Sequence, residues 1–420
     1  MRTAGGYHRL NPWRGLGSLR REIWFLCLAI LVNRSGTMVL PFLTLYLTVN
    51  RQLPAATAGL TLTVYGISAI VVAPLSGRLS DRLGGLRIMK LSLVLAGLLL
   101  FIFPFVDSLP GIFALTALWA IASEAFRPPS MAIIGDLAGP QQRKAAFALT
   151  RLAINVGMSI GPVIGGFLAM YSFKLLFYVD GATSLLAGIL IAALPWRMVG
   201  KAATNLDSTA QASDSPANTQ PQPALRYLDV LKDRRFMFFL IAMLPVELIF
   251  FQTLAAMPLF LVRDLHMTEA GFGLLLAINT VIIIVIEVPL NTAMADWSHR
   301  HSIALGALLI GIGFGALAIA DNVPAVAVTV VIWTFGEMIL LPASSAYVSD
   351  LAPREQAGAY MGLYTMGFSV AVAIGPWLGT QILEGYGAGA VWIGTLLCGC
   401  ITALMFWFMP RSEGAKATMS

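Results

Sequence analysis

Twelve long apolar runs dominate this sequence and restrict the folds that it can adopt. About 20 apolar residues are needed to cross the hydrocarbon core of a bilayer as a helix. The strict alternation that is typical of membrane β-barrel strands is missing from these runs. We therefore expect an all-α polytopic membrane protein with twelve transmembrane helices. The runs lie near residues 23–49, 57–76, 88–106, 110–135, 146–170, 174–195, 236–262, 271–293, 302–320, 323–348, 359–382 and 388–409.

The scarcity and placement of charges support this interpretation. Charged residues make up only 11% of the 420 residues, whereas soluble globular proteins carry roughly 25%. Most of the 27 Lys and Arg residues fall in segments on one side of the predicted membrane, which is the cytoplasmic side by the positive-inside rule. This bias explains the net charge of +6 without nucleic acid as a partner. We expect a cell-membrane protein with both termini in the cytoplasm.

The second half of the chain repeats landmarks of the first half. Many membrane transporters are built from two such internal repeats. The landmarks that recur in the second half at a nearly constant offset are Pro74 and Pro289, Asp81 and Asp296, Trp119 and Trp333, Pro128 and Pro342, Asp136 and Asp350, Gly161 and Gly375, and Gly165 and Gly379. We infer two six-helix halves related by duplication.

A polar stretch separates these halves. Residues 200–224 are rich in Ser, Thr, Gln and Pro and have almost nothing to bury, which is typical of a disordered linker. The predicted domains are a cytoplasmic arm at 1–22, a bundle at 23–197, a cytoplasmic linker at 198–235, a second bundle at 236–410 and a cytoplasmic tail at 411–420.

Two motifs resemble those of a known family. The loop Gly77-x-x-x-Asp81-Arg82-x-Gly84-x-x-Arg87 resembles the signature loop of the major facilitator superfamily, although Gly85 and Leu86 replace two basic positions. The fifth run carries glycines every four residues, and this stripe resembles the motif of the superfamily's drug:proton antiporters. The chain is most similar to twelve-span multidrug exporters of the MdtH type. The resemblance implies two pseudo-symmetric six-helix bundles, alternating access and proton coupling.

Each motif also has a physical interpretation. A glycine stripe allows close helix packing, and its predicted members are Gly157, Gly161, Pro162, Gly165, Gly375, Pro376 and Gly379. A charged loop at a helix end suits a latch that opens and closes the cytoplasmic side, or simply a positively charged anchor. The predicted latch residues are Gly77, Asp81, Arg82, Arg87, Asp136, Asp296 and Asp350.

Charged residues inside the apolar runs are the best candidates for a functional site. An ionisable side chain at mid-bilayer costs roughly 2.5–3.5 kcal/mol, so it should face a partner, water or a substrate. By the resemblance, spans one, four, seven and ten line the central path. The proton-coupling candidates are Glu124, Glu247 and Glu337. The substrate-binding candidates are Asn33, Arg34, Trp119, Glu124, Arg127, Gln252 and Trp333.

The role of Glu124 stays open at this point, because Glu124 and Arg127 share one helical face. Glu124 is either a proton carrier or half of a static salt bridge. Asp180 and Glu287 are better explained as structural groups, which hold spans together or cap polar backbone atoms.

Several functions are excluded by what the sequence lacks. It contains no Gly-x-x-x-x-Gly-Lys-Ser/Thr run for ATP and no His or Cys cluster for a metal. No nucleophile with a matching base is evident, so we expect neither an enzyme nor a cofactor. The expected partners are a small-molecule substrate, protons and the lipid bilayer, with the chain as a monomer.

Three functions remain. The first is proton-coupled export of small amphipathic molecules or drugs, from the cytoplasm across a bacterial inner membrane. The second is proton-coupled uptake of peptides or other carboxylate-bearing solutes, because Asn33-Arg34-Ser35-Gly36 is similar to the span-one region of peptide:proton symporters. The third is a membrane sensor or scaffold without transport.

Overall fold

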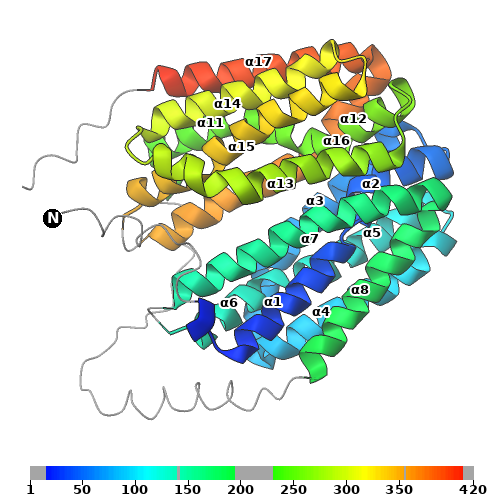
Figure 1. Cartoon of the computed structure of the whole chain (residues 1–420), viewed down its shortest axis with the longest axis vertical. Coiled ribbons are helices and arrows are strands. Elements are labelled where there is room, and N and C mark those ends of the chain that lie inside the picture. Colours follow the sequence, from blue (N-terminus) through cyan, green and yellow to red (C-terminus); the bar gives the residue numbers. More distant parts are fainter. Residues whose placement is uncertain (1–15, 140–141, 194–229, 354–355, 410–420) are drawn as a thin grey trace, which may run out of the picture. The chain divides into compact units, whose positions relative to one another are not determined.

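The computed structural model describes residues 16–139, 142–193, 230–353 and 356–409, and these residues form helices without strands (Figure 1). Twelve helical segments among them are long and apolar enough to cross a membrane, which confirms the predicted fold class. The first-half helices are α1 (Arg21–Gly36), α2 (Val39–Leu45), α3 (Ala55–Leu83), α4 (Gly85–Ile102), α5 (Leu109–Glu124), α6 (Arg127–Leu137), α7 (Arg143–Tyr171) and α8 (Phe173–Ala193). The second-half helices are α11 (Arg234–Phe250), α12 (Ala256–Leu259), α13 (Glu269–Ala293), α14 (His299–Gly315), α15 (Val323–Leu351), α16 (Ala357–Tyr386) and α17 (Ala388–Trp407).

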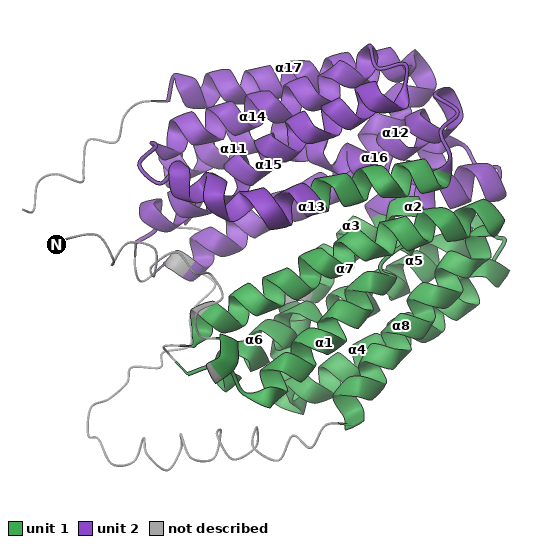
Figure 2. Ribbon diagram, in the orientation of Figure 1, with its two compact units in different colours: residues 1–42, 64–222, 269–280 green, residues 43–63, 223–268, 281–420 purple. Residues whose placement is uncertain are grey.

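The predicted tail at 411–420, most of the linker at 198–235 and most of the arm at 1–22 lie outside the described residues. The contacts divide the chain into two compact units, coloured green and purple in Figure 2. Unit 1 takes the described residues of 1–42, 64–222 and 269–280, and unit 2 takes those of 43–63, 223–268 and 281–420. Each unit thus includes a short segment from the other half of the sequence. The domain boundaries inferred from the duplication stay a prediction.

The first span is broken, and a buried carboxylate stabilises the break. Helix α1 ends at Gly36 and α2 begins at Val39. The first N–H groups of a helix have no partner within it. Asp180 of α8 supplies one, because its Oδ2 accepts the N–H groups of Met38 at 3.3 Å and Val39 at 3.2 Å. This arrangement agrees with the structural role expected for Asp180.

The fourth span is broken by prolines. Helix α5 ends at Glu124 and α6 begins at Arg127, followed by Pro128 and Pro129. Proline has no N–H, so Pro129 cannot bond to the carbonyl of Ala125 four residues earlier. The hydroxyl of Ser76, from α3, donates to that carbonyl at 2.6 Å instead.

In the second half, the corresponding helix α15 is continuous, and a side chain from a neighbouring helix again contacts the carbonyl that a proline leaves free. Pro342 lies inside α15 and leaves the carbonyl of Met338 without its helical donor. Asn291 of α13 donates through Nδ2 to this carbonyl at 3.4 Å and to the carbonyl of Glu287 at 2.9 Å. Asn291 follows Ser76 at the same offset by which Pro289 follows Pro74, so the two contacts occupy duplicate positions.

The glycine stripe of α7 packs against the break in the first span. A Cβ on Gly157 would lie 2.5 Å from Cβ of Arg34, and one on Gly161 would lie 3.1 Å from the carbonyl oxygen of Thr37. In the second half, a Cβ on Gly375 would lie 3.1 Å from the carbonyl oxygen of Leu248 in α11. The stripe therefore serves helix packing in both copies, and any further role in coupling stays a prediction.

Candidate functional site

A polar cavity of about 130 Å³ lies within unit 1, at the breaks in the first and fourth spans. Its lining comes from α1, α3, α4, α5, α7 and α8 together with Leu40 of α2. Four of the predicted site residues line it, namely Asn33, Arg34, Trp119 and Glu124. Residues distant in the sequence and carrying both signs of charge thus meet at one place.

Glu124 contacts two other side chains at this cavity. The hydroxyl of Tyr65 donates to its Oε1 at 3.1 Å. Arg127 contacts its Oε2 through NH1 at 3.5 Å, and 64% of the Arg127 side chain is exposed. The predicted Glu124–Arg127 pair is therefore present, but it is long and open to solvent, so it should contribute less than about 1 kcal/mol.

Arg34 differs from Arg127 because its Nε is buried and has no hydrogen-bond partner in the described part of the chain. No ion pair within 4 Å joins Arg34 to Glu124 or Asp180 among the described residues, and Asp180 already accepts two backbone N–H groups. The Nε–H of Arg34 is therefore a donor at this cavity without an acceptor among the described residues. A buried polar group without a partner marks a place where a ligand or water is expected.

The remaining wall combines aromatic and small polar groups. Trp119 and Tyr65 meet edge to face, with ring centroids 5.2 Å apart. Asn33 donates through Nδ2 to the Ser184 hydroxyl at 3.2 Å, which leaves its amide oxygen available. Sequence reasoning did not assign roles to Ser184 or Ser123, which also line the cavity. A lone serine in an apolar run gives no signal of its own.

In unit 2, Glu247 of α11 is buried, with 3% of its surface exposed. It makes no hydrogen bond or ion pair with the residues that the structure describes, and Gly367 of α16 leaves room beside it. A Cβ on Gly367 would lie 3.2 Å from Oε2 of Glu247. An ionised carboxylate in such a place is costly, so the neutral acid is the form that this site tolerates best. Glu337 is half-buried on α15.

Two other predicted substrate residues of unit 2 have structural contacts. Gln252 donates through Nε2 to the carbonyl oxygens of Leu248 at 3.0 Å and Gly375 at 2.8 Å, and its buried Oε1 has no partner among the described residues. Trp333 is buried against Phe314, with ring centroids 5.3 Å apart. Their role in substrate binding stays a prediction.

The predicted latch is only partly described. The side chain of Asp81 lies outside the described residues. Arg82, Arg87 and Asp136 are exposed, and no ion pair within 4 Å joins Arg82 to Asp136 in the described part of the chain. The backbone of Gly84 has φ +89°, which favours glycine and fits the tight turn between α3 and α4.

The second copy of the loop contains a contact that sequence reasoning missed. Asp350 pairs with His299, with Nε2 and Oδ2 2.9 Å apart. Asp296 is exposed. No sequence signal pointed to this pair, because the loop after α13 lacks the glycines of its first copy and no arginine stands at position 299.

The comparisons with known proteins agree with the twelve-span fold. The profile of the Major Facilitator Superfamily matches residues 25–263 and 248–418. The chain belongs to this superfamily. It is therefore a transporter, a multi-pass membrane protein and not an enzyme.

Relatives in the superfamily include an uncharacterized transporter, YqjV of Bacillus subtilis, which is 26% identical over 95% of both chains. A Na⁺, Li⁺, K⁺/H⁺ antiporter of Planococcus maritimus is 25% identical, with 82% of this chain and 85% of that protein covered. The multidrug resistance protein MdtH of Salmonella typhimurium is 23% identical, with 60% and 58% covered. The resemblance to MdtH-type transporters is thus confirmed.

Among solved structures, the nucleoside transporter NupG superposes with a TM-score of 0.78 over 92% of this chain and 98% of its own, at 13% identity. This likeness concerns the fold alone.

Proposed function

We propose that the chain is a proton-coupled exporter of small amphipathic molecules that works by alternating access. The observation that carries this proposal is the cavity in which Glu124, Tyr65 and the unpaired Nε of Arg34 meet. The carboxylate of Glu124 can take up a proton inside this cavity. Trp119 supplies an apolar surface for the substrate. The antiporter and multidrug relatives add support by analogy.

In this mechanism the ionised Glu124 accepts the Tyr65 hydroxyl and attracts Arg127. A proton that reaches Glu124 cancels its charge and removes the attraction to Arg127, while Tyr65 keeps an acceptor. The loss of this attraction favours the conformation that is open to the opposite side of the membrane, and the substrate is released there. The buried Glu247 is a second proton carrier in this proposal, and Glu337 a third candidate.

A second candidate function is uptake of solutes that carry a carboxylate, peptides included. The buried Nε of Arg34 favours it, because a guanidinium is a good donor to a carboxylate. In both proposals the chain is a monomer in a bacterial inner membrane, with its termini in the cytoplasm.

One experiment separates these functions. The purified chain is reconstituted in liposomes with an imposed pH gradient, and the movement of ethidium and of a labelled dipeptide is followed in both orientations of the gradient. Export predicts that ethidium moves against the proton flow. Dipeptide movement along the proton flow supports uptake instead. If neither solute nor any other of a broad panel moves faster than in empty liposomes, the proposed transport is refuted.

A further inference from the structure

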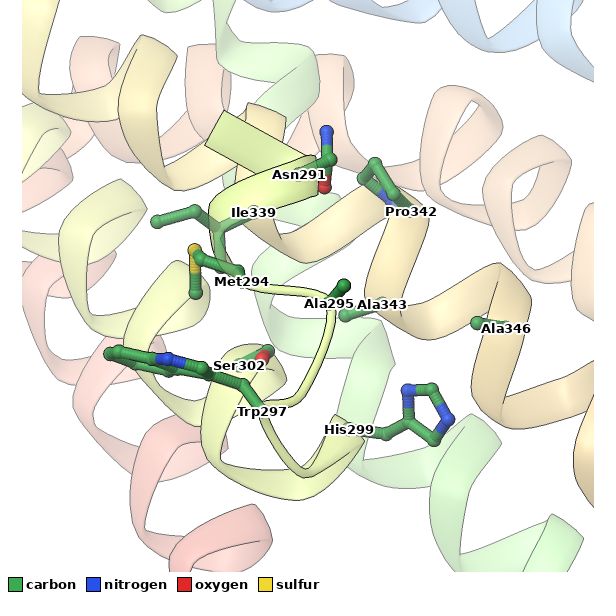
Figure 3. Close-up of a pocket in the computed structure, with 10 residues that line it drawn as sticks. All are labelled: Asn291, Met294, Ala295, Trp297, His299, Ser302, Ile339, Pro342, Ala343 and Ala346. Atoms are coloured by element: carbon green, nitrogen blue, oxygen red, sulfur yellow. The ribbon is translucent and has the colours of Figure 1, made fainter. Parts of the chain in front are cut away.

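Unit 2 contains a cavity of about 200 Å³, formed by the end of α13, the loop after it, the start of α14 and the middle of α15 (Figure 3). Its apolar wall includes Met294, Trp297, Ala343 and Ala346. Figure 3 shows the Trp297 indole and the His299 imidazole on opposite sides of the view, with Ala343 between them. Nothing in the transport mechanism above uses this cavity.

The two halves differ at this place, and the difference explains the room. In the first half a Cβ on Gly85 would lie 3.2 Å from Cδ1 of Ile133 and 3.4 Å from Cβ of Pro129, so the start of α4 packs closely on α6. Ala343 occupies the position of the second half that corresponds to Pro129, next to the duplicated proline. The smaller side chain leaves more room beside α15 in the second half.

Two polar groups at this cavity can act as acceptors. Asn291 uses both donor contacts of Nδ2 for the carbonyls of Glu287 and Met338, so its Oδ1 is left to accept. His299 faces Asp350 through Nε2 at 2.9 Å. When Nε2 donates its proton to Asp350, Nδ1 is an acceptor as well. A ligand with N–H donors would match these groups.

The charges near the cavity favour a cation. Asp296 and Asp350 are exposed carboxylates, and 73% of the Asp350 side chain is accessible. Arg300, at the start of α14, donates through NH1 to the carbonyl of Met409 at 2.9 Å, just after α17. The corresponding region of the first half is rich in arginine by contrast, with Arg78 and Arg82 in α3 and Arg87 in α4.

We propose that this cavity is a binding site for a small amphipathic amine. Its ammonium group is attracted by Asp350 and donates to Asn291 or His299, and its apolar body lies against Trp297 and Met294. An indole ring packs well against an apolar or aromatic body, and a thioether adapts to varied apolar shapes. The site is separate from the proposed transport cavity and holds whether or not proton-coupled export is correct.

The test uses 4-(trifluoromethyl)benzylamine as the probe and fluorine NMR of the full chain in lipid nanodiscs. The uncharged 4-(trifluoromethyl)benzyl alcohol is the matched control ligand. The amine should bind about fivefold or more tightly than the alcohol, because only the amine gains the attraction of Asp350. In Ala343→Leu the added side chain fills the cavity, and the binding of the amine should weaken about tenfold.

Two further variants keep the proposal falsifiable if Ala343→Leu is poorly folded. Asp350→Asn removes an exposed charge and leaves the cavity intact. It should therefore weaken the binding of the amine severalfold and leave the binding of the alcohol unchanged. Asp264→Asn removes a surface carboxylate of unit 2 that lines neither cavity, and it should leave amine binding unchanged. Equal binding of amine and alcohol, an unchanged amine affinity in Asp350→Asn, or loss of binding in Asp264→Asn would overturn the proposed site.

Discussion

Asp180 shows, at the residue scale, how an acidic side chain can be kept inside a membrane-spanning helix. Only 5% of it is exposed, and its Oδ2 accepts the N–H groups of Met38 and Val39. Without it the N–H of Val39 would lie unpaired at the start of α2, whereas the N–H of Met38 also donates to the carbonyl of Gly36. The carboxylate and the helix start therefore stabilise each other, and Arg34 is held at the edge of the break.

We predict that Asp180→Leu destabilises the protein, because the buried N–H of Val39 loses its acceptor at a cost of about 1–3 kcal/mol. Asp180→Asn is the matched control, since its amide oxygen can still accept. Thermal unfolding of the purified protein in detergent measures both. An Asp180→Leu variant that unfolds at the wild-type temperature contradicts this role.

The functional residues illustrate what the sequence can and cannot reveal at this scale. Arg34 and Glu124 were predicted to share a site because charges in apolar runs are costly, and the structure brings them to one cavity. The spacing also predicted the Glu124–Arg127 pair, which is present, but the sequence could not show that Arg34 makes no ion pair with Glu124 among the described residues, because that depends on side-chain direction. The sequence also could not show that Glu247 is more deeply buried than Glu337, the other proton-coupling candidate of the second half.

At the scale of elements, the proline breaks depend on side chains from neighbouring helices. Ser76 of α3 bonds to the Ala125 carbonyl that Pro129 leaves free, one residue after Glu124. Asn291 of α13 makes the corresponding contact to Met338 beside Pro342. Because both halves retain such a contact, we infer that it fixes the direction in which the fourth span of each half continues.

We predict that Ser76→Ala costs about 1–3 kcal/mol, because the carbonyl of Ala125 becomes a buried acceptor without a donor. Ser68→Ala is a matched control on the same helix, since the Ser68 hydroxyl bonds only to Val64 of α3 itself at 2.8 Å. Hydrogen exchange near residues 121–130 should accelerate in Ser76→Ala alone. Equal exchange in both variants would argue against the contact.

The glycine stripe leads to a second prediction for an element. In Gly157→Ala the new Cβ would meet Cβ of Arg34 at 2.5 Å, so α7 must move away from the first span. Gly394→Ala in α17 is the control, because no atom lies within 4 Å of its added Cβ. We expect Gly157→Ala to lower the unfolding temperature, and Gly394→Ala to raise it slightly through helix propensity. A higher unfolding temperature for Gly157→Ala than for Gly394→Ala would refute the packing role of Gly157.

Element positions were largely predictable, because hydropathy is a local property of the sequence. The twelve spans follow from it directly. The break between Gly36 and Val39 was not predicted, although Ser35-Gly36 precedes it and Pro41 follows it. Such residues are also tolerated inside unbroken membrane helices, and Asp180, which contacts the break, is far away in the chain. The exchange of segments 43–63 and 269–280 between the two units depends on tertiary contacts and leaves no sequence signal either.

At the scale of the whole molecule, the two duplicated halves carry ionisable groups at different positions. Asn33 lies beside Arg34 in the first span, and Glu247 occupies the position of the seventh span that corresponds to Asn33. The first half thus combines a basic group with a connected carboxylate, Glu124. The second half contributes a buried acid without a described hydrogen-bond partner. Such asymmetry allows the two halves to respond differently to one proton.

This asymmetry predicts different phenotypes for Glu124→Gln and Glu247→Gln. Glu124→Gln should lose both proton coupling and much of the substrate affinity, because Glu124 lies in the cavity with Arg34 and Trp119. Glu247→Gln mimics the neutral acid, so it should keep substrate exchange at equal pH and lose only transport driven by a pH gradient. Counterflow and gradient-driven uptake in liposomes measure the two activities separately.

The control for both variants is Asp264→Asn, which removes a carboxylate that pairs with the exposed Arg263 at 2.8 Å. It should transport normally, because a surface pair of this kind contributes little. If Glu247→Gln transports as well as Asp264→Asn under a pH gradient, Glu247 does not carry the proton. If Glu124→Gln also behaves like the control, the cavity of unit 1 has no part in coupling and the proposed mechanism fails.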